Sequence, residues 1–480
     1  MTTTIHTPGA ERADAPAAAD PQADYPALHR ELRAGFDGGA YRPITARRQA
    51  LKRLRAALKD MEADFTLALG RDLGKPAFES YTSEIGFCYQ EIDHVLKHLR
   101  RWAAPEPVNV GLALWPTTAA SYRVPKGVVL VVAPWNYPLN LALAPLISAV
   151  AAGNCVALKP AEDAPAVSAA LAELVGRAFE REHVRAVEGP GAEVVPALMD
   201  AGRFDHVFYT GSTRVGRSLA ERCGRELIPC TLELGGKSPV VVWDDARLEV
   251  AAQRIAWAKC FNAGQTCVAP DYALVHRDVY PAFLRKLTDE LRRAYGEDPR
   301  QSPDLARMVN REHAARLARL LEGATVAYGG EADPEARYVA PTVVTDVDQD
   351  HALLTEEVFG PVLPVLPVDD FAEVKRVIAR NPNPLAAYLF TQTDKLAERF
   401  IAEVQFGGGC INDAVIHLGI PSLPFGGVQE SGLGRYHADE GFRAFSNQKS
   451  IARTSGYVNP PTRYAPYREA FLKAVRLLFG

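Results

Sequence analysis

The longest apolar stretch of this chain, residues 127–161, contains a single charge, Lys159, and constrains the fold more than any other feature. It is long enough to cross a bilayer. Prolines and a Gly-Asn pair interrupt it, however, and such residues end strands and helices. The breaks predict a strand at 128–133, a turn at 134–138, an apolar helix from about 139 and a second buried strand at 155–158. We therefore expect a βαβ unit of a parallel sheet.

Helices and strands continue to alternate along the rest of the chain. Two long helices are expected before the apolar stretch, over 47–69 and 84–102, where they would cover one face of the sheet. Further strands are expected at 206–210 and 240–243, with helices over 164–182 and 215–223. The alternation predicts a doubly wound α/β domain. It restarts after residue 236 and predicts a second α/β domain, with strands at 272–276 and 362–368 and helices through 293 and around 312–322.

Length and composition narrow the class of protein. A chain of 480 residues exceeds what one hydrophobic core usually organises. The net charge of −4 and the pI near 6.3 favour neither nucleic acid nor a membrane surface as a partner. Residues 1–24 contain acidic residues and no apolar run, so we expect a disordered tail there instead of a targeting signal.

The seven cysteines are interpreted as free thiols. Their odd number and the lack of a CxxC pair argue against a disulfide framework, and they predict a reducing compartment, the cytoplasm. None of the eleven histidines has the spacing of metal ligands, so no metal site is expected.

Cys267, in Phe-Asn-Ala-Gly-Gln-Thr-Cys-Val-Ala-Pro-Asp-Tyr (261–272), is the candidate nucleophile. A thiol attacks carbonyl carbons as the thiolate, so it needs a base or a charge that stabilises the anion. Lys259 is the one basic residue within eight positions, so help must come from Glu233, in Thr-Leu-Glu-Leu-Gly-Gly-Lys (231–237), or from a helix dipole. Neighbouring glycines predict that both groups lie on tight turns. Taken singly, each could equally be a structural cysteine or a surface carboxylate.

With these motifs the chain resembles the aldehyde dehydrogenase superfamily, and its Gly-Gln-Thr-Cys-Val-Ala-Pro-Asp-Tyr run is similar to the class 3 branch. Five further motifs follow the family's order between residues 25 and 457: Ala-Pro-Trp-Asn-Tyr-Pro (133–138), Leu-Lys-Pro-Ala-Glu (158–162), Tyr-Thr-Gly-Ser-Thr-Arg-Val-Gly (209–216), Glu-Glu-Val-Phe-Gly-Pro (356–361) and Leu-Pro-Phe-Gly-Gly-Val (423–428). Six ordered motifs are far more specific than one glycine pattern.

The resemblance implies a fold of three parts: a doubly wound parallel-sheet cofactor domain, a second α/β catalytic domain and a bridging arm for oligomerisation. The expected bounds are 25–104 and 123–235 for the NAD-binding domain, 236–425 for the catalytic domain, 105–122 and 445–456 for the oligomerisation strands, and 457–480 for a C-terminal segment. It also implies a homodimer, although a plain surface hairpin remains the alternative for 105–122.

A dinucleotide requires glycine between a strand and a helix, so that its pyrophosphate meets backbone amides. Residues 211–216 follow an expected strand and open a helix, but they carry two of the usual three glycines, so an ordinary turn remains an alternative. The resemblance implies that Gly211 and Ser212 approach the phosphates and that Glu357 and Phe359 hold the nicotinamide ribose and ring. It assigns the same cofactor to Trp135, Thr213, Arg214, Val215, Gly216 and Leu234.

Lys159 and Glu162 lie just past a strand end, where they can bind ribose hydroxyls. A carboxylate there repels a 2′-phosphate and favours a 2′-hydroxyl, so NAD is the expected cofactor. Because class 3 proteins often accept both nicotinamides with this glutamate in place, NADP stays open.

The resemblance implies oxidation of a small aldehyde to a carboxylic acid. Cys267 would add to the carbonyl to form a thiohemiacetal, whose oxyanion the Asn136 side-chain amide and the Cys267 backbone N–H would bind. Glu233 would then activate the water that hydrolyses the resulting thioester. Medium-chain aliphatic or aromatic aldehydes are the expected substrates, in an acyl pocket that includes Tyr137.

Three other functions are compatible with parts of this pattern. A catalytically retired scaffold that serves as a binding protein predicts damage to the catalytic set, but Asn136, Glu233 and Cys267 are all present. A thiol hydrolase would orient its cysteine with a histidine, and no histidine lies between His206 and His276. A CoA-acylating relative would usually lack the base at position 233.

The C-terminal motif departs from the family's pattern at two positions. Gln429 and Ala438 occupy places where class 3 proteins usually carry glycine. We expect these changes to alter the loops around them without affecting the catalytic set.

Overall fold

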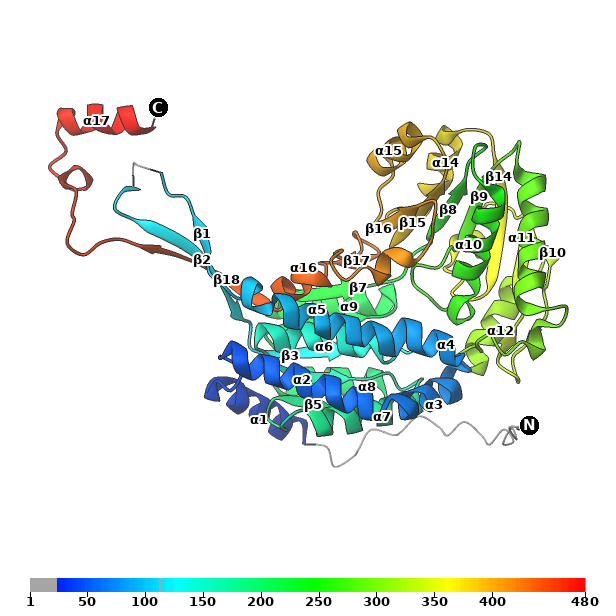
Figure 1. The fold of residues 1–480 in the computed structure, drawn as a ribbon, viewed down its shortest axis with the longest axis horizontal. Helices are drawn as coiled ribbons and strands as arrows, with labels where there is room; N and C mark the ends of the chain where they lie inside the picture. Colours follow the sequence, from blue (N-terminus) through cyan, green and yellow to red (C-terminus); the bar gives the residue numbers. More distant parts are fainter. Residues whose placement is uncertain (1–23, 112–113, 480) are drawn as a thin grey trace.

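The computed structural model describes residues 24–111 and 114–479, so the tail expected over residues 1–23 lies outside the described part of the chain. Two sheets with their covering helices form the body of the molecule (Figure 1). A narrow arm and the C-terminal segment project from one end of that body (Figure 1).

The first sheet has six strands in the order β17-β7-β6-β3-β4-β5. Their bounds are β3 Val128–Val132, β4 Cys155–Lys159, β5 Val184–Ala186, β6 His206–Thr210, β7 Cys230–Glu233 and β17 Gly432–Leu433. All neighbours are parallel except β17, which runs antiparallel to β7 at the edge. Strands β3, β4 and β6 are buried along their whole length, because helices cover both faces of a parallel sheet.

Alternate residues of β3 divide the core of this sheet into two layers. Val129 and Val131 pack with α2, α3, α5, α6 and α7, whereas Val128 and Leu130 pack with α1, α8 and α9. The helices are α1 Tyr25–Gly38, α2 Ile44–Asp60, α3 Glu62–Leu73, α5 Gly86–Trp102, α6 Asn140–Ala152, α7 Pro165–Ala178, α8 Gly191–Ala201 and α9 Thr213–Glu226. The βαβ unit expected from the apolar stretch is therefore β3-α6-β4, and that prediction is confirmed.

The second sheet has seven strands in the order β10-β13-β14-β9-β8-β15-β16. They are β8 Pro239–Val242, β9 Tyr272–His276, β10 Thr325–Tyr328, β13 Thr342–Thr345, β14 Val362–Val368, β15 Ala386–Phe390 and β16 Gly408–Ile411. The helices around it are α10 Leu248–Cys260, α11 Tyr280–Tyr295, α12 Arg311–Leu320, α13 Ala352–Thr355, α14 Phe371–Ile378 and α15 Asp394–Glu403. The hairpin β11 Ala332–Asp333 and β12 Tyr338–Val339 lies beside it.

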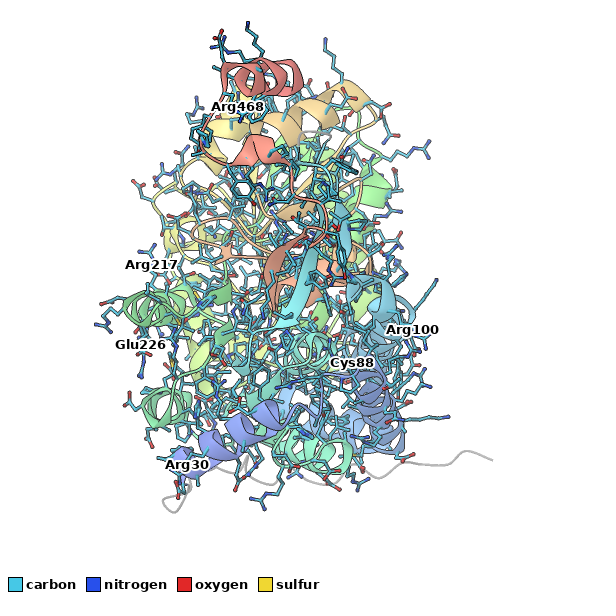
Figure 2. All side chains as sticks on the ribbon, turned by 90° about the vertical axis from the view of Figure 1, so that its left-hand side faces the viewer. Arg30, Cys88, Arg100, Arg217, Glu226 and Arg468 are labelled. Atoms are coloured by element: carbon cyan, nitrogen blue, oxygen red, sulfur yellow. The ribbon has the colours of Figure 1, made fainter. Side chains whose placement is uncertain are left out.

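The arm is a third, antiparallel sheet of β1 Glu106–Val108, β2 Thr118–Pro125 and β18 Ser446–Arg453. The late strand β18 pairs with β2 from Ser446 opposite Pro125 to Arg453 opposite Thr118. In Figure 2, which turns the arm toward the viewer, the arm and the C-terminal chain lie in front of the body. The chain ends in α16 Ala438–Ala444, β18 and α17 Glu469–Phe479.

Two expectations about the helices and strands were wrong. The helix expected over 47–69 is two helices, because Met61 leaves the helical region at φ −104° and ψ 13° and both helices then keep their apolar faces on the core. The short strands β5 and β7 were not expected at all. Glu233 therefore ends a strand and does not lie on a tight turn.

One further feature bears on the apolar stretch: none of the described helices is both long and apolar enough to span a membrane.

We predict that Phe208→Ala destabilises the protein by about 3–5 kcal/mol, because it empties a fully buried site in β6. The ring also packs against Tyr436 and Phe445, at 5.1 and 5.7 Å between centroids, which hold the late part of the chain onto the first sheet. Urea denaturation followed by circular dichroism measures the loss. Leu67→Ala, at a site that is 68% exposed, is the control and is expected to change stability by less than about 0.5 kcal/mol. An equal effect of both substitutions would contradict the prediction.

Candidate active site

A cavity of about 260 Å³ lies between the two sheets, at the carboxyl ends of β3, β6 and β7. Nine of the residues predicted for the site line it: Trp135, Asn136, Gly211, Ser212, Glu233, Leu234, Cys267, Glu357 and Phe359. The other predicted residues, Lys159, Glu162, Thr213, Arg214, Val215 and Gly216, are not among the lining residues. The fold thus brings together segments more than two hundred residues apart in the sequence.

Cys267 lies in a turn in which the amide of Ala269 donates to the carbonyl of Thr266 at 2.9 Å. Gly264 precedes it with φ 72°, and a Cβ there would lie 2.3 Å from the carbonyl oxygen of Gly360, so the approach to this turn requires glycine. No helix begins at Cys267 among the described residues, so the expected help from a helix dipole is not found.

Burial, together with the carboxyl groups of Glu357 and Glu233, raises the pKa of the Cys267 thiol to about 12. The backbone N–H groups of Cys267 and Val268 act in the opposite direction. The thiol is thus protonated at neutral pH, and a base has to remove its proton before it can attack a carbonyl.

Glu233 faces the cavity from the end of β7 and is 2% exposed. Neither carboxyl oxygen has a hydrogen-bond partner among the described residues. Burial therefore raises its pKa well above the usual range, against a weaker opposing effect of Arg435. A carboxyl group in this environment stays protonated to a higher pH than an exposed one, its ionised form is a stronger base, and both oxygens are free to bond to a molecule that enters the cavity.

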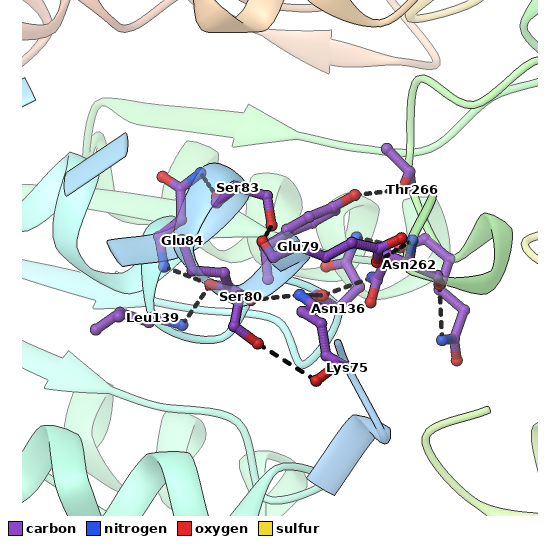
Figure 3. A network of polar contacts seen from close by, with 12 residues as sticks. Lys75, Glu79, Ser80, Ser83, Glu84, Asn136, Leu139, Asn262 and Thr266 are labelled. Atoms are coloured by element: carbon purple, nitrogen blue, oxygen red, sulfur yellow. Dashed lines mark hydrogen bonds and ion pairs between the residues drawn. The ribbon is translucent and has the colours of Figure 1, made fainter. Parts of the chain in front are cut away.

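Asn136 lines the cavity and is held by hydrogen bonds on both sides (Figure 3). Its side-chain amide donates to the carbonyl of Gln265 at 3.0 Å, which uses one of its two N–H groups. The backbone carbonyl of Asn136 accepts hydrogen bonds from the side-chain amide of Asn262 at 2.8 Å and from the ammonium group of Lys75 at 3.3 Å. These bonds join the loop after β3 to the loop that carries Cys267.

A buried ion pair lies behind Asn136. Lys75 and Glu84 are both fully buried, and their side chains are 2.5 Å apart (Figure 3). The second oxygen of Glu84 accepts from the backbone amides of Leu139 and Asn140 at the start of α6. Sequence reasoning missed this pair, because the two residues precede the apolar stretch and no motif joins them to Asn136.

In the glycine-containing segment at the start of α9, neighbouring side chains come close to the backbone. A Cβ on Gly211 would lie 2.3 Å from the Tyr209 hydroxyl, and one on Gly216 would lie 2.4 Å from Leu234. Ser212 caps the helix and accepts weakly from the amide of Val215, at 3.5 Å. A residue larger than glycine at either position would therefore displace Tyr209 or Leu234 near the N-terminus of α9, where backbone amides attract phosphate.

Lys159 and Glu162 form an ion pair beside this segment. Glu162 also accepts from the amide of Gly191 at 2.7 Å, and the nearby positive charge and backbone N–H groups lower its pKa in spite of its partial burial. Glu162 is therefore ionised at neutral pH, as the charge argument for a 2′-hydroxyl requires.

Glu357 and Phe359 enter the cavity from the second sheet's side. A Cβ on Gly235 would lie 2.2 Å from the Glu357 carboxylate, so glycine is needed there for close approach. Burial raises the pKa of Glu357 to about 8. Phe359 has φ 50°, an uncommon conformation for an aromatic residue, and its ring packs edge-on against Trp135 at 5.4 Å.

Sequence reasoning gave no role in the site to eight further lining residues. They are Pro134, Leu141, Thr210, Gly235, His313, Arg316, Phe425 and Tyr436. His313 packs against Trp135 at 4.9 Å, and Arg316 donates to the carbonyl of Glu357 at 3.1 Å. Both come from α12, whose amphipathic pattern resembles that of any surface helix. Phe425 could have been found from the sequence, because it lies in the family motif 423–428, to which no role in the site was assigned.

Two remaining expectations about the site concern loops and substrate contacts. Tyr137 was expected in the acyl pocket, but it is not among the lining residues, because its hydroxyl bonds to Thr266 at 2.6 Å on the buried side of the loop.

Gln429, one of the two positions that depart from the family's C-terminal motif, has φ 55°, the left-handed conformation that glycine adopts most easily. Ala438 starts α16.

Comparison with known proteins gives a consistent result. The aldehyde dehydrogenase family model matches residues 3–451. Aldehyde dehydrogenase family 3 member H1 of Arabidopsis thaliana is 42% identical, over 93% of both chains. The dimeric NADP-preferring aldehyde dehydrogenase of Canis lupus familiaris is 40% identical, over 87% of this chain and 92% of its own. The substrate-bound structure of Staphylococcus aureus AldH superposes with a TM-score of 0.92 at 39% identity, covering 95% of this chain and 99% of that one. The chain therefore belongs to the aldehyde dehydrogenase family and resembles its class 3 members.

Proposed function

We propose that the protein oxidises an aldehyde to the carboxylic acid with a nicotinamide cofactor, and that Cys267 is the nucleophile. The observation that carries the proposal is the meeting of Cys267, Glu233 and Asn136 in one buried cavity. The Cys267 sulfur adds to the carbonyl carbon after the ionised form of Glu233, directly or through a water, takes the thiol proton. The second N–H of Asn136 and the backbone N–H of Cys267 donate to the oxyanion, a contribution of about 3 kcal/mol for one donor.

Glu233 also acts in the second half of the reaction. When bound, NAD or NADP supplies a hydride acceptor, so that the adduct on Cys267 becomes a thioester. Glu233 has two oxygens without hydrogen-bond partners among the described residues, so once the thiol proton has passed from it to solvent, it can hold a water and take its proton as that water attacks the thioester. Burial strengthens the carboxylate as a base because it raises the pKa.

The cofactor is proposed to lie between the N-terminus of α9 and the Glu357–Phe359 loop. Gly211 and Ser212 line the cavity at the N-terminus of α9, which supports a phosphate beside the backbone amides there. The Lys159–Glu162 pair favours NAD by charge, whereas the canine relative's name is NADP-preferring, so we propose that both are accepted with NAD favoured.

We further propose a homodimer in the cytoplasm, with residues 25–104 and 123–235 as the NAD-binding domain and 236–425 as the catalytic domain. The relative named as dimeric and the protruding arm, β1-β2-β18, support the dimer. Residues 105–122 and 445–456 would supply its oligomerisation strands, next to the C-terminal segment 457–480. The seven free thiols support a reducing compartment.

The first prediction tests the activity and the nucleophile together. The protein should reduce NAD or NADP, measured as absorbance at 340 nm, with a panel of aliphatic and aromatic aldehydes and without added CoA. Cys267→Ala should remove turnover, whereas Cys410→Ala, which changes a partly exposed cysteine outside the cavity, should leave it unchanged. Turnover that requires CoA, or ester hydrolysis without any aldehyde-dependent signal at 340 nm, would refute the proposed reaction.

Glu233→Gln should preserve adduct formation and slow hydrolysis of the thioester, so stopped-flow traces should show a burst of NADH followed by slow turnover. In the parent protein the steady-state rate should rise with pH above the usual carboxyl range, because a raised pKa keeps Glu233 protonated to higher pH. The variant should lose that rise. A variant without a burst but with a normal steady-state rate would show that another group is the base.

The pair Lys75–Glu84 should position Asn136. Glu84→Gln is expected to lower kcat by about 10- to 100-fold with little change in the KM for the cofactor, because a small displacement of a donor has a large effect on rate. It also leaves Lys75 buried without its partner, which destabilises by about 3–5 kcal/mol.

A double variant separates positioning from stability. Lys75→Met with Glu84→Gln should recover most of the thermal stability, because no charge remains buried, yet kcat should stay low. Glu62→Gln, which changes a carboxylate bonded to Tyr89 outside this network, is the control. Full recovery of kcat in the double variant would show that the pair acts through stability alone.

A further inference from the structure

Two cysteines lie near the amino-terminal end of β7, whereas the cavity lies at the carboxyl end of that strand. Cys223 lies in the last turns of α9, and Cys230 is the first residue of β7, the strand whose last residue is Glu233. Helix α9 ends at Glu226, which Figure 2 places at the margin of the molecule. The proposed function uses neither cysteine.

A tight turn between α9 and β7 brings the two thiols together. Leu227 ends the helix in the left-handed conformation, at φ 54°, and the amide of Ile228 donates back to the carbonyl of Cys223 at 2.8 Å. Alternate residues of a strand share a face, and Ile228 and Leu232 belong to the same apolar cluster as Cys223. Cys230 lies between them in the sequence and packs against that cluster, so its thiol lies on the same face of the sheet as the Cys223 thiol.

Charged groups from the segment before β3 and from α9 act on this pair. Lys126, which precedes β3, lies with its ammonium nitrogen 3.0 Å from the His206 ring, and that ring is 3.1 Å from the hydroxyl of Thr231. Burial, aided by Lys126, lowers the pKa of His206 well below its usual range, so the ring is neutral. Arg222 and Glu226 act on Cys223 from α9 with opposite signs.

These surroundings distinguish Cys230 from the other cysteines. The neighbouring Cys223 thiol and the charge of Lys126 lower the pKa of Cys230, although burial opposes them. All seven cysteines lie in the described part of the chain, and for the other six the pKa is raised. Cys230 is also partly exposed to solvent.

We propose that Cys223 and Cys230 form a reversible disulfide when the protein meets hydrogen peroxide, at a site separate from the proposed nucleophile. The Cys230 thiolate attacks one peroxide oxygen, the O–O bond breaks, and a sulfenic acid forms as hydroxide leaves. The Cys223 sulfur then attacks the sulfenic sulfur, and the departing hydroxyl and the Cys223 proton form water. The two thiols lose two electrons, and the peroxide becomes two waters.

The inference does not depend on dehydrogenase activity, because its test reads the thiols directly. Fully reduced full-length protein at pH 7 is treated with one equivalent of hydrogen peroxide, quenched with N-ethylmaleimide and mapped by mass spectrometry. Arg225 separates the two cysteines into different tryptic peptides, so the disulfide appears as a linked pair. We expect this link to form first and to disappear with dithiothreitol, while Cys267 remains alkylated. Oxidation of Cys267 before this pair, or a Cys230 that stays alkylated, would overturn the proposal.

Three variants test how the pair reacts. In Cys223→Ser, Cys230 should stop at the sulfenic acid, which dimedone traps. Lys126→Met should slow its reaction with peroxide at pH 7 by about tenfold, because less thiolate is present. Cys410→Ser should form the link as the parent protein does. A disulfide between two protein molecules in the parent protein, or an unchanged rate in Lys126→Met, would contradict the proposed chemistry.

Discussion

The site depends on the hydrogen bonds that join the loop after β3 to the loop before Cys267. Asn136 donates to Gln265 and accepts from Asn262, so one residue is bonded to both ends of the 262–265 turn. The turn has little freedom of its own, since Asn262 and Ala263 have left-handed backbone angles and Gly264 approaches Gly360 closely. These contacts hold the two loops that carry Asn136 and Cys267 against each other at the cavity.

A second constraint is the low polarity of the cavity. Burial raises the pKa of Cys267, Glu233 and Glu357 together, and each carboxylate, when ionised, also disfavours the thiolate. The three groups therefore cannot all ionise at neutral pH in the structure described. The thiol has to lose its proton to the ionised form of Glu233 or to water before it becomes reactive, and a carboxyl group without hydrogen-bond partners beside the buried cysteine can serve as that acceptor.

Much of the fold follows from local patterns in the sequence. The apolar stretch with its prolines predicts β3-α6-β4 correctly, and strand 272–276 agrees with β9 at both ends. Strand β7 escaped notice because it is short and ends in a charged residue, and the break at Met61 escaped because an unbroken apolar period runs across it. The site was predictable only in part. Its motif residues carry recognisable sequence, whereas His313, Lys75 and Glu84 reach it through tertiary contacts that no local pattern records.

The backbone of Phe359 has one more consequence. Its left-handed conformation costs about 1–3 kcal/mol, which the packing around it has to offset during folding. Arg316 fixes the preceding residues by hydrogen bonds to the carbonyls of Glu357 and Val358, so the aromatic ring is held against Trp135 before any ligand arrives. A mobile loop would lose conformational entropy when it bound a ligand. The Phe359 loop has already lost that entropy in the free protein, so a planar ligand would pack against a ring whose position is fixed beforehand.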